Sequence, residues 1–260
     1  MKTLKTPEEK AQIDVAWKEA DTFASQVLAL GLPDLLNIFC IGSLPGNYFR
    51  PGQSDLDVVV LLSGSPPQTP EALARPKTIN SALMKLASQS SPYELEALLH
   101  YISEIKRNPL TGLLPNPDLS ARLYLQSSPL YGDFDYSQLI LPTSQDFQQE
   151  TEHYLAYWQE KWGSEFYQKA SARELVNHAL TLMRLYLASC RGNILYIKTL
   201  LVESYLESKP EIPLPAEVEA SITRQISGKT LASHELNNLR TQLPGFQSLI
   251  VQAIQDFKHG

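Results

Sequence analysis

The stretch Phe39-Cys40-Ile41-Gly42-Ser43 is followed, after a loop of turn-forming residues, by Ser54-Asp55-Leu56-Asp57-Val58-Val59-Val60-Leu61-Leu62. The second stretch is β-branched or aliphatic after its acidic start, which predicts a strand over 55–62. The segment from Leu35 to Ile41 is also apolar and predicts a strand that ends at the Gly42-Ser43 loop. Two short buried strands joined by a polar loop indicate a small sheet in the N-terminal part of the chain.

The two aspartates that open the second strand have a spacing with a chemical meaning. Side chains alternate between the faces of a strand, so Asp55 and Asp57 project from the same side. Neighbouring carboxylates repel each other, and Mg²⁺ takes one or two carboxylates together with phosphate oxygens and water. Gly42 permits close backbone approach, while the Ser43 hydroxyl and neighbouring N–H groups suit phosphate oxygens. The sequence therefore predicts a site for a nucleoside triphosphate with one or two Mg²⁺ ions.

Composition places the chain among folded globular proteins, because 43% of its 260 residues are apolar and 19% are charged. The 22 basic against 28 acidic residues give a net charge of −6, which argues against a nucleic-acid-binding protein. Cys40 and Cys190 lack metal-ligand spacing, and we expect both to be buried thiols. The five histidines show no HxxxH or HxH spacing, and we expect no metal ligand among them. Sequence motifs of P-loop, zinc-hydrolase and serine-hydrolase sites are absent.

Targeting features also bear on the expected location of the protein. The longest apolar runs are far shorter than the roughly 18 residues that a bilayer requires. Glu8, Glu9 and Lys10 occupy positions where a secretory signal would need its apolar stretch. We therefore expect a cytoplasmic protein without a membrane partner, and we favour a monomer.

Hydrophobic periodicity divides the chain near Leu141-Pro142-Thr143. Before this point it predicts helices over 7–30 and 78–88, a strand over 93–102 and a turn at 130–133, and leaves 119–126 open. After it, helices are predicted over 145–162, 171–191, 194–208, 215–227 and 233–257, with a break at Pro244-Gly245. The expected fold class is α+β, with a mixed-sheet domain over 1–142 and an all-α helical-bundle domain over 143–260.

The pattern Gly42-Ser43, Arg50-Pro51 and Ser54-Asp55-Leu56-Asp57-Val58 resembles the nucleotidyltransferase superfamily, which has the polymerase-β-like fold. It is most similar to the streptomycin and spectinomycin adenylyltransferases within that superfamily. The resemblance implies an enzyme of the EC 2.7.7 class, with ATP as the favoured substrate. It also implies a third carboxylate on a neighbouring strand, as a metal ligand or general base, for which we favour Glu96 over the alternative Glu94.

The resemblance extends into the helical domain, which we expect to close the cleft. It matches Arg184 and Lys198 to nucleotide-binding positions and Glu174 to an acidic acceptor-binding position. Each has a plainer alternative: Arg184 in a helix-face ion pair, with Glu174 as one partner, and Lys198 on the surface. Ala170 departs from the pattern, because a second acidic residue is expected there.

These observations lead to one functional hypothesis and one alternative. The hypothesis is a Mg²⁺-dependent nucleotidyltransferase that moves a nucleoside monophosphate to a hydroxyl of a small-molecule acceptor and releases pyrophosphate. Asp55, Asp57 and Glu96 form its metal and catalytic set, and the resemblance points to aminoglycoside or aminocyclitol antibiotics, and hence antibiotic resistance. The alternative is a nucleotide-binding regulatory protein, or an antitoxin-like protein that adenylylates a partner protein.

Overall fold

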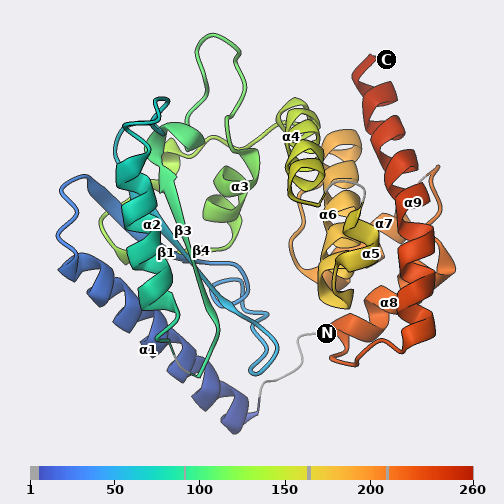
Figure 1. Cartoon of the computed structure of the whole chain (residues 1–260), viewed down its shortest axis with the longest axis horizontal. Coiled ribbons are helices and arrows are strands. Elements are labelled where there is room, and N and C mark those ends of the chain that lie inside the picture. The colour runs from blue at the N-terminus through green and yellow to red at the C-terminus, as the bar shows by residue number, and fades with distance from the viewer. Residues whose placement is uncertain (1–5, 91, 163–164, 209–210, 260) are drawn as a thin grey trace. The chain divides into compact units, whose positions relative to one another are not determined.

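The computed structural model describes residues 6–90, 92–162, 165–208 and 211–259, and it divides into two compact units between Leu141 and Pro142 (Figure 1). The fold class is α+β, as predicted: a small sheet with its helices forms the first unit, and the described part of the second unit is helical. None of the described helices combines the length and the apolar character that a membrane crossing requires.

The first unit contains four strands that form one sheet of order β3-β2-β1-β4. Its elements are α1 (Pro7–Ala29), β1 (Leu35–Ile41), β2 (Leu56–Leu62), α2 (Ala74–Ala87), β3 (Leu95–Tyr101), η1 (Ile102–Ile105), α3 (Pro117–Leu125), β4 (Ser127–Tyr131) and η2 (Tyr136–Gln138). β1 runs antiparallel to β2 and β4, whereas β2 and β3 are parallel and are joined through α2. The mixed sheet and the three strands predicted from periodicity are confirmed.

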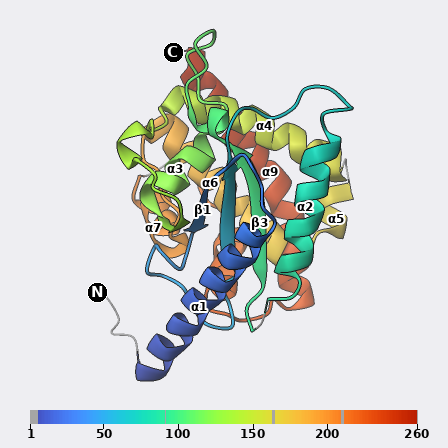
Figure 2. The ribbon, with the colours of Figure 1, turned by 90° about the vertical axis from the view of Figure 1, so that its left-hand side faces the viewer.

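The strands alternate cleanly between two apolar layers. Val58, Val60 and Leu62 of β2 pack into a cluster with α1 and α2, whereas Val59 and Leu61 pack into a second cluster with α3. Figure 2 shows α1 and α2 over one face of the sheet and α3 at the opposite face. Both faces are covered, which explains why β2 reads as an unbroken apolar run after its acidic start.

The structure corrects several predicted boundaries in the first unit. Residues 127–131 form the edge strand β4, although the sequence predicted a turn at 130–133. Pro129 obscures the strand signal, and it is tolerated because an edge strand need not donate every backbone N–H. Most of the segment 119–126, which the sequence left open, belongs to α3, which begins with Pro117 after the N-cap Asn116. Helix α2 begins at Ala74, four residues before the predicted start.

The second unit contains α4 (Ser144–Trp162), α5 (Phe166–Lys169), α6 (Ala172–Arg191), α7 (Lys198–Glu207), α8 (Ala216–Ile226) and α9 (Ser233–His259). Helix α7 begins four residues later than predicted, and the short α5 was not predicted. The predicted break at Pro244-Gly245 is wrong, because α9 continues through Pro244. Leu243, Phe246 and Ile250 are buried on both sides of the proline, and their packing offsets the hydrogen bond that it removes.

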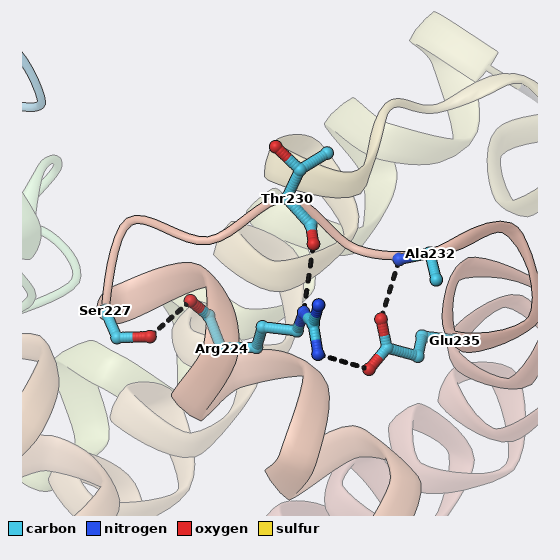
Figure 3. Close-up of polar contacts among 5 residues, drawn as sticks. All are labelled: Arg224, Ser227, Thr230, Ala232 and Glu235. Carbon is cyan, nitrogen blue, oxygen red and sulfur yellow. Dashed lines mark hydrogen bonds and ion pairs between the residues drawn. The ribbon is translucent and has the colours of Figure 1, made fainter.

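A polar connection fixes the turn between α8 and α9 (Figure 3). Arg224 donates from Nε to the Thr230 carbonyl oxygen at 2.9 Å and from a terminal nitrogen to Glu235 at 3.2 Å. The other Glu235 oxygen accepts from the Ala232 N–H at 2.6 Å, just before α9 begins. Side chains of both helices therefore hold the end of the loop that leads into α9.

His178 forms the polar centre of the second unit, where it is buried among aromatic rings. Its Nδ1 lies 2.7 Å from the Tyr154 hydroxyl, and its Nε2 lies 2.7 Å from Gln247 Oε1. Because a carbonyl oxygen only accepts, Nε2 carries the proton and Nδ1 accepts from Tyr154. Burial lowers the pKa of His178 from 6.5 to about 4, although the hydrogen bond that His178 donates to Gln247 acts in the opposite direction.

We predict that acidification destabilises this unit through His178. The unfolded chain binds more protons than the folded protein between pH 6.5 and about 4, so stability falls as the pH falls through that window. Thermal unfolding followed by circular dichroism should show a smaller loss of midpoint temperature between pH 7 and pH 4 in His178→Gln than in the wild type. The exposed His153, changed to Gln, is the control and should retain the wild-type dependence. Equal slopes for both variants would contradict the assignment.

Candidate active site

The acidic residues predicted from sequence lie on the face of the sheet that α3 covers. Asp57 of β2 is in register with Glu96 of β3 on one side and with Ile41 of β1 on the other. The odd-numbered positions of β2 face α3, so Asp57 shares this face with Val59 and Leu61. Paired positions on adjacent strands place Asp57 and Glu96 side by side at the start of both strands.

A pocket of about 230 Å³ contains both carboxylates. Its polar lining comes from β2, β3 and α3: Asp57, Glu96, His100, Asn116, Asp118 and Arg122. Glu96 and His100 are both even-numbered positions of β3 and therefore point to the same side of the sheet. Asp118 and Arg122 form an i,i+4 ion pair on α3, with Nε and Oδ2 2.9 Å apart. A sheet face and one helix thus build a polar pocket around Asp57 and Glu96.

The structure treats the predicted carboxylates differently. Asp57 and Glu96 line the pocket, whereas Asp55 is half-buried just before β2 and is not among the described lining residues. Glu94 is exposed ahead of β3, and its carbonyl oxygen accepts from the Leu56 N–H at 2.8 Å. The geometry therefore favours Glu96 over Glu94 as the partner of Asp57.

Gly42 brings the backbone of the loop close to the Asp57 carboxylate. Its φ of +81° lies in the left-handed region, and a Cβ at this position would lie 2.8 Å from Asp57 Oδ2. Only glycine satisfies both the backbone conformation and this close approach. The loop therefore passes directly over the Asp57 carboxylate, as the spacing of these residues suggested.

The backbone amides of the loop are largely used within the protein. Gly42 N–H donates to the Gln126 carbonyl oxygen at 2.9 Å, Gly46 N–H to Gly42 at 3.0 Å and Tyr48 N–H to Ser43 at 3.0 Å. Among the described residues of this loop, the N–H groups of Ser43 and Leu44 donate to no backbone oxygen. The donors expected from sequence at the start of the turn are thus the Ser43 hydroxyl and these two consecutive amides.

The residues present fit a magnesium ion. Two carboxylates in register offer hard oxygen ligands of the kind that Mg²⁺ prefers. In the described part of the chain, no group of three or more His, Cys, Asp or Glu is close enough to hold a metal by itself. Mg²⁺ commonly binds through one or two carboxylates and completes its shell with substrate phosphates and water, so the pair Asp57 and Glu96 meets this requirement.

His100 and Glu104 are functional candidates that the sequence analysis missed. His100 Nδ1 lies 3.0 Å from Glu104 Oε1, and the second Glu104 oxygen accepts from the Tyr101 N–H at 2.6 Å. Burial favours a higher pKa for Glu104, but hydrogen bonding and the charge of His100, with further bonds from Tyr101 and Asn116, hold its pKa below the usual value. The i,i+4 spacing of His100 and Glu104 across the end of a strand gave no signal, because a tight turn of 3₁₀ helix brings them together.

Glu174, Arg184 and Lys198 all belong to the second unit. Glu174 accepts from the Ser171 N–H at 2.8 Å in a capping box, so its carboxylate also stabilises the start of α6. Arg184 lies over the Tyr196 ring at 5.0 Å, and Lys198 Nζ donates to Asn177 Oδ1 at 3.2 Å.

Glu174 and Arg184 lie on one stripe of α6, and Lys198 of α7 contacts the same stripe through Asn177. Glu174, Asn177, Thr181 and Arg184 follow helical spacing and are partly exposed on a helix that is otherwise mostly buried. Glu174 and Arg184 are ten positions apart, which corresponds to about 15 Å of helix axis. Both lie on this stripe, and the ion pair between them considered from sequence stays a prediction.

The two cysteines differ in their surroundings. Cys40 is fully buried in β1, and burial, reinforced by the charges of Asp57 and Asp21, raises its pKa to about 12. Cys190 is only half-buried, in contrast to the expectation from sequence. Both are free thiols, and Cys40 stays protonated as part of the core.

No protein-family model and no curated protein matches the chain. Among solved structures, it is similar to spectinomycin adenyltransferase AAD(9) from Enterococcus faecialis, solved with ATP and spectinomycin. The TM-score is 0.56 and the identity 19%, over 89% of this chain and 99% of that chain. A protein from Sulfolobus solfataricus assigned as a nucleotidyltransferase has 16% identity and a TM-score of 0.29, over 38% and 79% of the two chains. The first likeness shows that the chain shares the fold of that adenyltransferase.

We predict that Gly42→Ala lowers the free energy of unfolding more than Gly52→Ala does. Both glycines have a φ between +75° and +81°, but a Cβ on Gly52 meets nothing within 4 Å. Each substitution should cost about 1–2 kcal/mol of unfolding free energy for the left-handed backbone. Gly42→Ala should lose more, because its methyl group displaces the Asp57 carboxylate. Urea unfolding measures the difference, and equal losses would contradict the close approach.

Proposed function

We propose that the protein is a Mg²⁺-dependent nucleotidyltransferase that transfers a nucleoside monophosphate, with ATP as the favoured donor, to a hydroxyl of a small-molecule acceptor. The observation that carries this proposal is the register of Asp57 with Glu96 beside the Gly42-Ser43 loop in one pocket. The likeness in fold to an adenyltransferase solved with ATP supports it. We place the activity in the cytoplasm.

In this proposal, Asp57 and Glu96, with Asp55 before them, would hold one or two Mg²⁺ ions. The bound metal would supply electrostatic stabilisation of the triphosphate and of the leaving pyrophosphate. The Ser43 hydroxyl and the amides of Ser43 and Leu44 would bind phosphate oxygens at the start of the turn. Gly42 leaves these groups close to the Asp57 carboxylate, so the protein positions phosphate next to its acidic pair.

The proposed reaction is a single displacement at the α-phosphorus. The acceptor oxygen forms a bond to the α-phosphorus while the bond to the β-phosphate oxygen breaks, and pyrophosphate leaves. Glu96 takes the hydroxyl proton, a role worth on the order of 10²- to 10⁴-fold in rate. Its exposed position in the pocket gives an acceptor access to the carboxylate.

In this proposal, residues of the second unit also bind the nucleotide and the acceptor. Arg184 and Lys198 would neutralise the nucleotide phosphates, and Glu174 would bind the acceptor. Lys198 donates to Asn177, which lies on the same partly exposed stripe of α6 as Glu174, and this placement supports a common role. Spectinomycin, which the similar adenyltransferase binds in its solved structure, is the first acceptor to test, followed by other aminocyclitols and aminoglycosides.

We predict that Asp57→Asn abolishes pyrophosphate release while the protein remains folded, because the neutral amide is a far weaker metal ligand. Glu96→Gln should lower turnover by about 10²-fold or more through loss of the base. Glu94→Gln is the matched control, because Glu94 precedes the same strand but does not line the pocket. Its turnover should match the wild type.

Pyrophosphate release from ATP and Mg²⁺ with each acceptor provides the measurement, and calorimetric titration of ATP provides the binding control. Unchanged turnover in Asp57→Asn would refute the assignment of the metal site. Metal-dependent ATP binding without pyrophosphate release for any small molecule would favour the regulatory or protein-modifying alternative. Absence of ATP binding in the wild type would remove the proposed function itself.

A further inference from the structure

Both ends of the Gly42-Ser43 turn converge on a single residue, Gln126. The Gln126 carbonyl oxygen accepts from the Gly42 N–H at 2.9 Å, and its side-chain Oε1 accepts from the Tyr48 hydroxyl at 2.6 Å. Gln126 is 8% exposed, so both bonds are shielded from water. Gln126 follows Gly42 by 84 positions and Tyr48 by 78 positions, and it holds both ends of the turn.

Contacts inside the turn fix the Tyr48 ring in place for this bond. Tyr48 N–H donates to the Ser43 carbonyl oxygen at 3.0 Å, which closes the turn upon itself. Gly46 lies directly under the ring, because a Cβ on Gly46 would overlap the Tyr48 side chain and would lie 2.8 Å from the Gly42 carbonyl oxygen. The hydroxyl therefore approaches Gln126 from a defined direction.

Gln126 also caps the helix that forms one wall of the pocket. It is the C-cap residue of α3, and its N–H donates to the Arg122 carbonyl oxygen. The same helix supplies Asn116, Asp118 and Arg122 to the pocket lining. Gln126 thus links the helix that forms the pocket wall to the turn that carries Ser43.

We infer that Gln126 and Tyr48 form a positioning pair that holds the Gly42-Ser43 turn in its phosphate-binding conformation and ties it to α3. This inference rests on the proposed function of the turn. Ser43 and Leu44, whose amides face no backbone acceptor within the described loop, lie between the two anchored ends. The pair does not touch the reacting atoms, so its effect is expressed in nucleotide affinity through the shape of the turn.

The test is calorimetric titration of Mg²⁺-ATP into wild type and Tyr48→Phe. Removal of the hydroxyl leaves a buried Gln126 oxygen without its donor and frees one end of the turn, so the dissociation constant should rise about tenfold. Tyr93→Phe is the matched control, because the Tyr93 hydroxyl also donates one hydrogen bond within the first unit, to the Gln12 carbonyl oxygen at 2.9 Å. It should bind Mg²⁺-ATP as the wild type does.

A double-mutant cycle separates the pair from a general loss of stability. Gln126→Leu, and the double variant Tyr48→Phe with Gln126→Leu, should weaken ATP binding by similar factors, because both remove the same bond. Additive losses, or an unchanged dissociation constant in folded Tyr48→Phe, would overturn the inference while the proposed function stands. A wild type that binds no Mg²⁺-ATP would instead overturn the proposed function, and the inference with it. Thermal unfolding of each variant confirms that the comparison is made between folded proteins.

Discussion

The candidate site depends on the register between β2 and β3. Asp57 and Glu96 are paired positions on parallel strands, and the two-residue repeat of the pleat turns both toward α3. A slip of one residue in either strand would turn its carboxylate into the apolar layer that α1 and α2 cover. The opposite face of the same strands fixes the register, because Val58, Val60 and Leu62 must remain buried there. Burial of one face thus positions the charges on the other.

The Gly42 loop shows how a turn can be rigid without regular secondary structure. Most of its backbone amides are satisfied by carbonyl oxygens of the turn itself or of Gln126, which leaves Ser43 and Leu44 as donors within the described loop. The contact between Gly42 and Asp57 then fixes the turn against the strand. Rigid placement of donors matters because electrostatic stabilisation is largest when no reorganisation is required on binding.

In the helical unit, packing between the helices decides which polar side chains of α6 remain exposed. Most of α6 is covered by neighbouring helices, and the remaining stripe carries Glu174, Asn177, Thr181 and Arg184. On its buried side, His178 is held neutral by burial within a hydrogen-bonded network of Tyr154 and Gln247. The same helix therefore separates a buried polar network from a partly exposed polar stripe.

The amino-acid sequence by itself determined the strands β1, β2 and β3, the fold class, and the association of Gly42, Asp55 and Asp57 with one loop and strand, because these depend on local periodicity and spacing. Only the tertiary structure decided that Glu96 rather than Glu94 accompanies Asp57, that His100 and α3 complete the pocket, and that Gln126 anchors the turn. Pro129 in β4 and Pro244 in α9 misled the local signals, because edge position and core packing offset the cost of each proline. Strand pairing and packing join residues far apart in the chain, and local sequence carries no record of those partners.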